Sequence, residues 1–120
     1  MKTVLTVDDS RTMRDMLLFT LTDAGFRVVQ AEDGLHGLEV LRAETPDVVV
    51  TDINMPRMDG FGFIEGVRAD ERYRSVPILV LTTESDAEKK NRARRAGATG
   101  WVVKPFDPVK LVEAVRRVAA

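Results

Sequence analysis

The chain has 120 residues, of which 44% are hydrophobic and 31% charged, values typical of one globular domain with a single core. Its 18 lysines and arginines nearly balance 19 aspartates and glutamates, which excludes a general attraction to nucleic acids or anionic membranes. The absence of cysteine excludes disulfide bonds and thiolate metal sites, and no apolar run could serve as a signal peptide or membrane span. We expect a soluble, cytoplasmic, monomeric protein whose single domain spans residues 1–120.

Short apolar runs rich in β-branched residues alternate with helical patterns along the whole chain. We expect strands at residues 3–7, 27–31, 47–51, 77–82 and 99–103. Apolar residues at helical spacing predict helices around residues 13–21, 35–41, 61–67 and 111–118, and a fifth, polar helix is expected at 86–97. This alternation predicts an α/β fold, a doubly wound five-stranded parallel sheet with five helices covering both faces.

The composition of each segment indicates its place in this fold. The runs at 47–51 and 77–82 are apolar without alternation, as in central strands buried on both sides, whereas 27–31 is more polar and suits an edge. Asp33 and the pair Asp107–Pro108 predict helix starts, and either Asp9 or Ser10 could cap the first helix. Core packing is the expected role of four large side chains, Met13, Met16, Phe61 and Phe63.

The expected helix at residues 86–97 differs from the others because alanine is its only apolar residue. Such a helix can bury little surface, so we expect it to be weakly held and the most mobile of the five. Its cations are Lys89, Lys90, Arg92, Arg94 and Arg95. A charge run of this kind forms either a solvated face or a surface for an acidic partner, and the sequence leaves both open.

Polar side chains occur where four of the expected strands end. They are Asp8 and Asp9 at the first strand, Asp52 at the third, Thr82 and Thr83 at the fourth, and Lys104 at the fifth. Because the carboxyl ends of parallel strands share one edge of the sheet, where ligands bind in open α/β folds, we expect these side chains to converge. One acid could merely cap a helix, whereas three converging acids predict a functional site.

Three carboxylates at one edge require a compensating positive charge. Two like charges about 4 Å apart repel by about 4 kcal/mol at an effective dielectric constant of about 20, and whole domains are stable by only about 5–15 kcal/mol. A raised pKa, the Lys104 ammonium or a bound cation could compensate. Oxygen donors without His or Cys favour Mg²⁺, Mn²⁺ or Ca²⁺ over Zn²⁺, and a few carboxylates with room for a phosphate favour Mg²⁺.

The same set of side chains suits phosphoryl transfer. The Asp52 carboxylate can attack phosphorus to form an acyl phosphate, and it needs no general base because it is already ionised. The reaction depends mainly on positioning and on neutralisation of charge. A cation, the Lys104 ammonium and the Thr82 hydroxyl could each contact a different phosphoryl oxygen.

Four motifs in this order resemble the receiver domain of bacterial two-component response regulators: "VDDS" at 7–10, "DINMPRMDG" at 52–60, "LTT" at 81–83 and "KPF" at 104–106. Each motif alone is weak, but four in register at strand ends are highly specific, and the resemblance covers the whole chain. Within the family, "DDSRTMR" at 8–14 and the expected absence of an output domain are most similar to stand-alone chemotaxis regulators. The resemblance implies a flavodoxin-like sheet with strand order 2-1-3-4-5.

The resemblance also implies roles for individual residues. Asp52 would be the phosphoacceptor, and Mg²⁺ would be bound by Asp52, by Asp9 directly, by Asp8 through water and by the backbone carbonyl of Asn54. Thr82, with Thr83 beside it, would be the switch hydroxyl. Lys104 would bind the phosphoryl group and precede a cis bond to Pro105.

Trp101 occupies the aromatic switch position that tyrosine or phenylalanine usually holds in the family. An indole needs a larger pocket and a hydrogen-bond partner for its N–H, so the family's inward–outward ring motion is not carried over to it. The expected partner-binding face consists of Lys89, Arg92, Arg95, Trp101 and Lys110. The resemblance implies a histidine kinase as phosphodonor, a flagellar motor switch protein as target and a phosphatase as a further partner, with no nucleic acid and no membrane.

Two other function classes are less consistent with the residues. A Mg²⁺-dependent phosphatase with an aspartyl nucleophile needs a second acid two residues later, where this chain has Asn54, so we expect a switch rather than an enzyme. A flavin carrier needs a phosphate-cradling first loop, whereas the acids of residues 8–12 would repel phosphate.

Within signalling, the sequence leaves open whether the chain binds the motor, relays phosphate to a histidine domain or drains it from a kinase. Arg57 and His36 are expected to be solvated surface residues.

Overall fold

The computed structural model describes residues 1–83 and 87–120 and confirms the α/β fold. Five parallel strands form one sheet in the order β2-β1-β3-β4-β5. The strands are β1 (Thr3–Val7), β2 (Arg27–Ala31), β3 (Val48–Thr51), β4 (Ile78–Thr82) and β5 (Gly100–Val103). The helices are α1 (Arg11–Asp23), α2 (Gly34–Glu44), α3 (Gly60–Ala69), α4 (Ala87–Ala96) and α5 (Pro108–Ala119), with a short 3₁₀ turn at Glu71–Tyr73.

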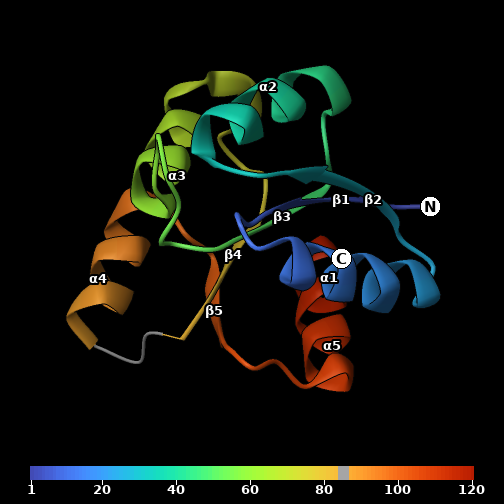
Figure 1. The fold of residues 1–120 in the computed structure, drawn as a ribbon. Helices are drawn as coiled ribbons and strands as arrows, with labels where there is room; N and C mark the ends of the chain where they lie inside the picture. Colours follow the sequence, from blue (N-terminus) through green and yellow to red (C-terminus); the bar gives the residue numbers. More distant parts are fainter. Residues whose placement is uncertain (84–86) are drawn as a thin grey trace.

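The helices cover the sheet as two separate layers (Figure 1). Helices α1 and α5 pack on one face over a core that includes Leu17, Leu21, Leu111 and Val115. Helices α2, α3 and α4 pack on the other face over a core that includes Leu38, Leu41, Phe63, Ile64 and Ala93. Because both faces are covered, every residue of β3 and β4 is buried, as the unbroken apolar runs predicted.

Local sequence explains where the helices begin. The Ser10 hydroxyl accepts the Met13 N–H at 3.2 Å and thereby caps α1, while Asp33, Asp59 and Asp107 cap α2, α3 and α5.

The expectation that Met16 packs in the core was wrong: 46% of this residue is exposed, because it lies on the solvent side of α1. In the described part of the chain, no helix combines the length and the hydropathy needed to cross a membrane.

Helix α4 is attached to the rest of the molecule by few apolar contacts. Among its residues only Ala93 is fully buried, and the residue expected to begin the helix, Asp86, lies outside the described residues. The C-terminal end of α4 is held by Arg68 of α3, whose Nε and Nη2 donate to the Gly97 carbonyl at 3.0 and 2.8 Å. The same guanidinium donates through Nη1 to the Tyr73 carbonyl at 2.9 Å. The C-terminal end of α4 is therefore held by these polar contacts as well as by the packing of Ala93 and Ala96 against the core.

We predict that the backbone amides of α4 exchange with solvent at least about tenfold faster than those of α5, a difference of about 1.4 kcal/mol in local opening. The reason is burial, since α5 inserts Leu111 and Val115 into the core while α4 inserts one alanine. Hydrogen exchange followed by mass spectrometry measures this directly on the unphosphorylated protein. Equal protection of residues 87–96 and 108–119 would contradict the prediction.

Candidate functional site

The carboxyl ends of β1 and β3 bring three acidic side chains together. The Asp52 backbone N–H donates to the Val7 carbonyl at 2.9 Å, so the two strands end side by side. Carboxylate oxygens of Asp8, Asp9 and Asp52 all lie within 4.8 Å of one another. Asp8 and Asp52 are buried, whereas Asp9 is exposed and leaves the cluster open to solvent. The convergence predicted from the strand ends is therefore present.

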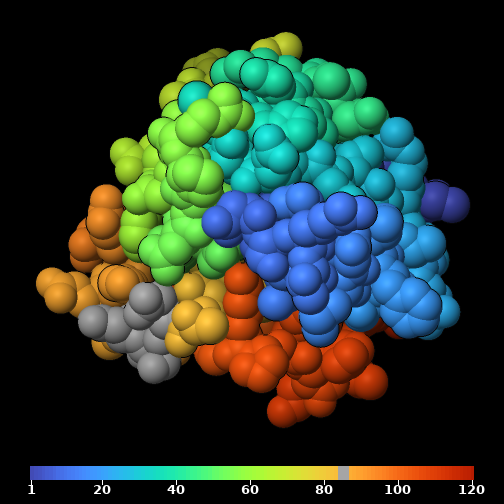
Figure 2. Space-filling view, viewed as in Figure 1, coloured from blue at the N-terminus to red at the C-terminus, as the bar shows by residue number. Residues whose placement is uncertain are grey.

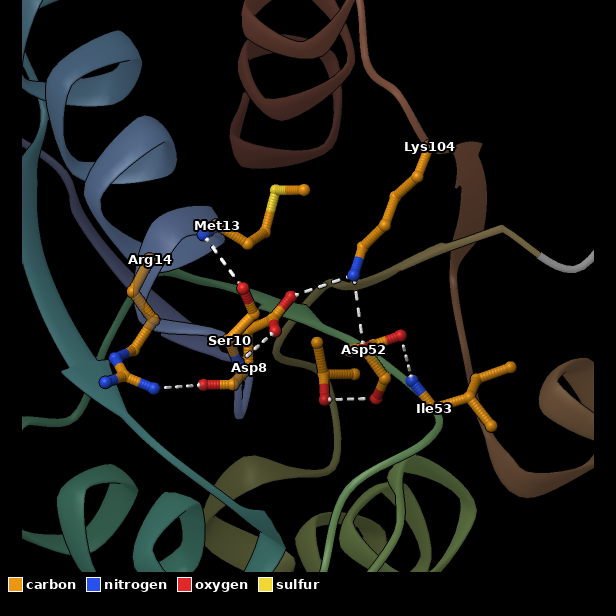
Figure 3. A network of polar contacts seen from close by, with 8 residues as sticks. Asp8, Ser10, Met13, Arg14, Asp52, Ile53 and Lys104 are labelled. Carbon is orange, nitrogen blue, oxygen red and sulfur yellow. Dashed lines mark hydrogen bonds and ion pairs between the residues drawn. The ribbon is translucent and has the colours of Figure 1, made fainter.

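Lys104 lies between the two buried carboxylates (Figure 3). Its Nζ is 3.1 Å from Asp8 Oδ2 and 3.2 Å from Asp52 Oδ2, and only 12% of its side chain is exposed. Its backbone N–H donates to the Thr82 carbonyl at 2.9 Å, which fixes the segment after β5 to the end of β4. The bond to Pro105 is cis, as the resemblance implied.

The second oxygen of each buried carboxylate accepts a backbone hydrogen bond. Asp8 Oδ1 accepts the Ser10 N–H at 2.9 Å, and Asp52 Oδ1 accepts the Ile53 N–H at 2.7 Å. Both side chains are therefore held from two directions, by a backbone N–H and by the Lys104 ammonium. This fixes the Asp52 carboxylate before any ligand arrives, which is the preorganisation that group transfer requires.

The electrostatics of the cluster remain unbalanced. Burial raises the pKa of Asp52, and the Lys104 ammonium and the Ile53 N–H offset this only in part, while the Asp8 charge adds to it. Burial by itself would lower the pKa of Lys104, but the carboxylates of Asp52 and Asp8 outweigh it and the pKa is raised. Lys104 is thus a stable cation, and a charge on Asp52 costs free energy in the folded protein.

The donor atoms fit a small hard cation. Within residues 1–83 and 87–120, Asp8, Asp9 and Asp52 form the one cluster of three or more potential ligands, and its donors are all oxygens. Oxygen-only donors with an exposed member favour magnesium or a similar ion, which keeps several of its waters. Asn54 follows two residues after Asp52 and is exposed, and its carbonyl stays a predicted ligand.

The residues predicted to act as a switch lie on β4 and β5. Thr82 is buried at the end of β4, and Thr83 is exposed just beyond it. Trp101 is half-buried in β5, and its indole Nε1 is buried without a hydrogen-bond partner among the described residues. Within the described segments, Trp101 in this conformation therefore lacks the hydrogen-bond partner that a buried indole N–H needs.

The expected partner face included Arg92 and Arg95 but neither Lys90 nor Arg94. The cations of α4 lie on two sides of the helix. Arg92 and Arg95 line a groove against α3, where the Arg92 guanidinium lies 4.1 Å from the centre of the Phe61 ring. Lys90 and Arg94 lie on the other side, where they line a cavity of about 70 Å³ with Trp101. The Lys90 ammonium is 5.7 Å from the indole ring centre.

Lys89 and Lys110 complete the predicted partner face. Lys89 is half-buried on α4, and Lys110 is exposed in the first turn of α5. Of the cations on α4, the structure therefore brings Lys90 and Arg94 next to Trp101, and it places Arg92 and Arg95 on the α3 side. Helical spacing was the available signal, because residues 90 and 94 are one turn apart and share a face.

Sequence reasoning missed one contact near the site. Arg57 is exposed, as expected, but its Nε also donates to the buried Asp33 carboxylate at 2.7 Å. His36 is half-buried, and its Nδ1 accepts the Glu32 N–H at 3.2 Å. The Arg57–Asp33 pair joins the loop after β3 to the start of α2, and the partners lie 24 positions apart with no pattern between them that predicts the contact.

The doubly wound parallel sheet gathers three carboxylates and a lysine at the carboxyl ends of its strands. This places the protein in a class of α/β proteins that have an acidic site at this edge of the sheet. Residues 4–116 match the response regulator receiver domain family, and the chain belongs to this family. It is 40% identical to chemotaxis protein CheY-3 of Vibrio cholerae over 116 residues, covering 96% of this chain and 89% of that protein.

Solved structures agree with this assignment. Vibrio cholerae CheY4 superimposes with a TM-score of 0.95 at 47% identity over 98% of each chain. The receiver domain of the sensor histidine kinase PA1611 from Pseudomonas aeruginosa PAO1, with a TM-score of 0.91 at 25% identity over 98% of this chain and 97% of that one, was solved with a magnesium ion coordinated in its active site cleft.

Proposed function

We propose that the protein is a cytoplasmic phospho-accepting switch. Asp52 takes a phosphoryl group from a histidine kinase in the presence of Mg²⁺, and the phosphorylated form binds a downstream protein, the flagellar motor switch in chemotaxis. The observation that carries the proposal is the placement of Lys104 between Asp8 and Asp52 beside the exposed Asp9. The chemotaxis assignment is supported by the identity to CheY-3 and CheY4, and the cation by the magnesium in the PA1611 receiver domain.

The proposed chemistry follows from the charges of the cluster. An Asp52 oxygen attacks phosphorus, a new P–O bond forms, and the bond to the donor breaks with its electron pair leaving on the donor. The ionised Asp52 carboxylate is the nucleophile, so the attack itself needs no general base. Lys104 moves from balancing two carboxylates to binding a phosphoryl oxygen, and Thr82 donates its hydroxyl to another. Bound magnesium would neutralise further charge on the phosphoryl group. The chain is a switch rather than an enzyme, since the modified group is its own.

Phosphorylation by a small donor tests the core of this proposal. Incubation with acetyl phosphate and magnesium is expected to add one phosphoryl group per chain, as measured by intact mass. Borohydride reduction of the acyl phosphate followed by peptide mapping then identifies the modified aspartate. Modification at Asp52 that disappears in chelator supports the proposal, whereas no incorporation, or incorporation at another residue, would overturn it.

The proposed partner surface consists of Trp101, Lys90, Arg94 and Lys110. Its cations favour an acidic segment, and the cavity beside Trp101 gives that segment a point of entry. Binding of purified motor switch protein is expected to strengthen on phosphorylation and to weaken with salt. If phosphorylation leaves motor binding unchanged but the phosphoryl group passes to a histidine domain or kinase, the protein is a relay or phosphate sink instead.

Lys104→Arg is predicted to reduce the phosphorylation-dependent gain in partner affinity by about tenfold or more, although the charge is kept. The ammonium contacts two carboxylates in a nearly closed space, and a planar guanidinium cannot occupy the same point. The loss of one charge-assisted hydrogen bond, about 1.5–3 kcal/mol, sets the magnitude. Titrations of phosphorylated variant and wild type against the partner measure it, with the exposed Lys2→Arg as control. A wild-type gain in the variant would remove Lys104 from the switch.

A further inference from the structure

The loop between β3 and α3 is closed at its base and turned tightly at its tip. At the base, the Gly60 N–H donates to the Ile53 carbonyl at 2.7 Å, one residue after the proposed phosphoacceptor. At the tip, the Met58 N–H donates to the Pro56 carbonyl at 2.7 Å. The loop thus begins directly at Asp52 and contains Asn54, the predicted carbonyl ligand, between these two fixed points.

The tip of this loop is bound to the start of α2, against which the loop (green) lies in the space-filling view (Figure 2). Arg57 Nε donates to Asp33 Oδ2 at 2.7 Å, and the Asp33 side chain is only 5% exposed. The Gly34 N–H donates to the Met58 carbonyl at 3.1 Å. A Cβ at Gly34 would lie 2.6 Å from that carbonyl oxygen, so the two segments meet as closely as glycine allows.

Arg57 adopts a backbone conformation that its side chain does not favour. Its φ is 65°, in the left-handed region, which glycine adopts without steric strain and other residues do not. The hydrogen bond from Arg57 to Asp33 is the described contact that offsets this strain. The same bond lowers the pKa of Asp33, so the pair stays charged. Asp33 is fixed in turn, because its Oδ1 accepts the His36 N–H at 2.9 Å and caps α2.

We propose that Asp33 and Arg57 are positioning residues for the cation site, holding the β3–α3 loop so that Asp52 and the Asn54 carbonyl keep the geometry that magnesium requires. This inference rests on the proposed function, because it assumes magnesium at the acidic cluster. Neither side chain belongs to that cluster, so the pair acts through the loop backbone. Groups that orient the ligands of a metal commonly change its affinity by about 10–100-fold.

Two substitutions of Arg57 separate positioning from stability. Arg57→Ala removes the bond to Asp33 and keeps the backbone strain, whereas Arg57→Gly removes both the bond and the strain. Both variants are expected to bind magnesium about tenfold more weakly by calorimetric titration, although Arg57→Gly should melt at a higher temperature than Arg57→Ala. Arg27→Ala is the matched control, because Arg27 pairs with Glu44 at 3.0 Å and is similarly exposed.

A double-mutant cycle shows whether Arg57 acts through Asp33. Asp33→Asn combined with Arg57→Ala should bind magnesium no more weakly than the weaker single variant, since either change breaks the same bond. Wild-type magnesium affinity in Arg57→Ala and Arg57→Gly, or fully additive losses in the cycle, would overturn the inference while leaving the proposed function intact. Failure of the wild type itself to bind magnesium would overturn both.

Discussion

Asp52→Asn is expected to abolish phosphorylation by acetyl phosphate in the presence of magnesium, to the detection limit of intact mass spectrometry. Asp52 is the acid at the end of the central strand β3, and its carboxylate is held between the Ile53 N–H and the Lys104 ammonium. An amide has nearly the same shape but lacks the ionised oxygen that attacks phosphorus. Among the proposed changes, this one removes the reacting atom itself, so its effect should be the largest.

A matched control separates this effect from a change of fold. Asp15→Asn alters an exposed carboxylate on α1 and should be phosphorylated like the wild type. The Asp52→Asn protein should also melt cooperatively, which shows that the loss is chemical. Incorporation into Asp52→Asn at the wild-type rate and stoichiometry would exclude Asp52 as the phosphoacceptor.

Magnesium is expected to stabilise the folded protein strongly. The cation binds the folded cluster of Asp8, Asp9 and Asp52 and hardly binds the unfolded chain, so a hundredfold excess over its dissociation constant should add about 2.7 kcal/mol. For a domain of this size that corresponds to a rise of about 10 °C in Tm. Thermal melts with magnesium and with chelator measure it. Sodium chloride at matched ionic strength should not reproduce the rise, because screening is not coordination. An unchanged Tm at saturating magnesium would mean that the cluster holds no cation.

The metal-free cluster should also show its strain as a dependence on pH. Burial raises the pKa of Asp52 above the ordinary aspartate value of 3.8, so the folded protein resists ionising this group. In chelator, the wild type should therefore lose stability as the pH rises from 3.8 through the raised pKa, and Asp52→Asn should not. Melts from about pH 4 to about pH 8 should show the variant to be more stable at neutral pH. A variant clearly less stable than wild type there would contradict a strained site.

Features that depend on the ends of strands were predictable from the sequence. The unbroken apolar runs identified β3 and β4 as central, and a parallel sheet then places Asp8, Asp9, Asp52 and Lys104 at one edge. The strand order itself followed from the resemblance to receiver domains, since hydropathy does not distinguish one arrangement of parallel strands from another. The roles assigned to the side chains at this edge stay predictions.

Contacts that join segments far apart in the sequence were not predictable. Arg57 reaches Asp33 because the β3–α3 loop turns back over α2, a path set by backbone conformation rather than by periodicity. Arg68 finds the Gly97 carbonyl for the same kind of reason. The exposure of Met16 has another cause, because helical spacing identifies a face of α1 only to within the width of one side chain.

The contact between Arg68 and Gly97 determines how α4 could move. Because the guanidinium fixes the C-terminal end of α4 to α3 through two bonds to one carbonyl, any tilt of the helix would pivot there. Ten residues at 1.5 Å each make the helix about 15 Å long, so a tilt of about 10° would displace the first turn by about 2.6 Å. A small change at the strand end would be amplified along the helix, and Lys90 would travel farther than Arg94. Arg68 therefore determines the point about which the helix would pivot.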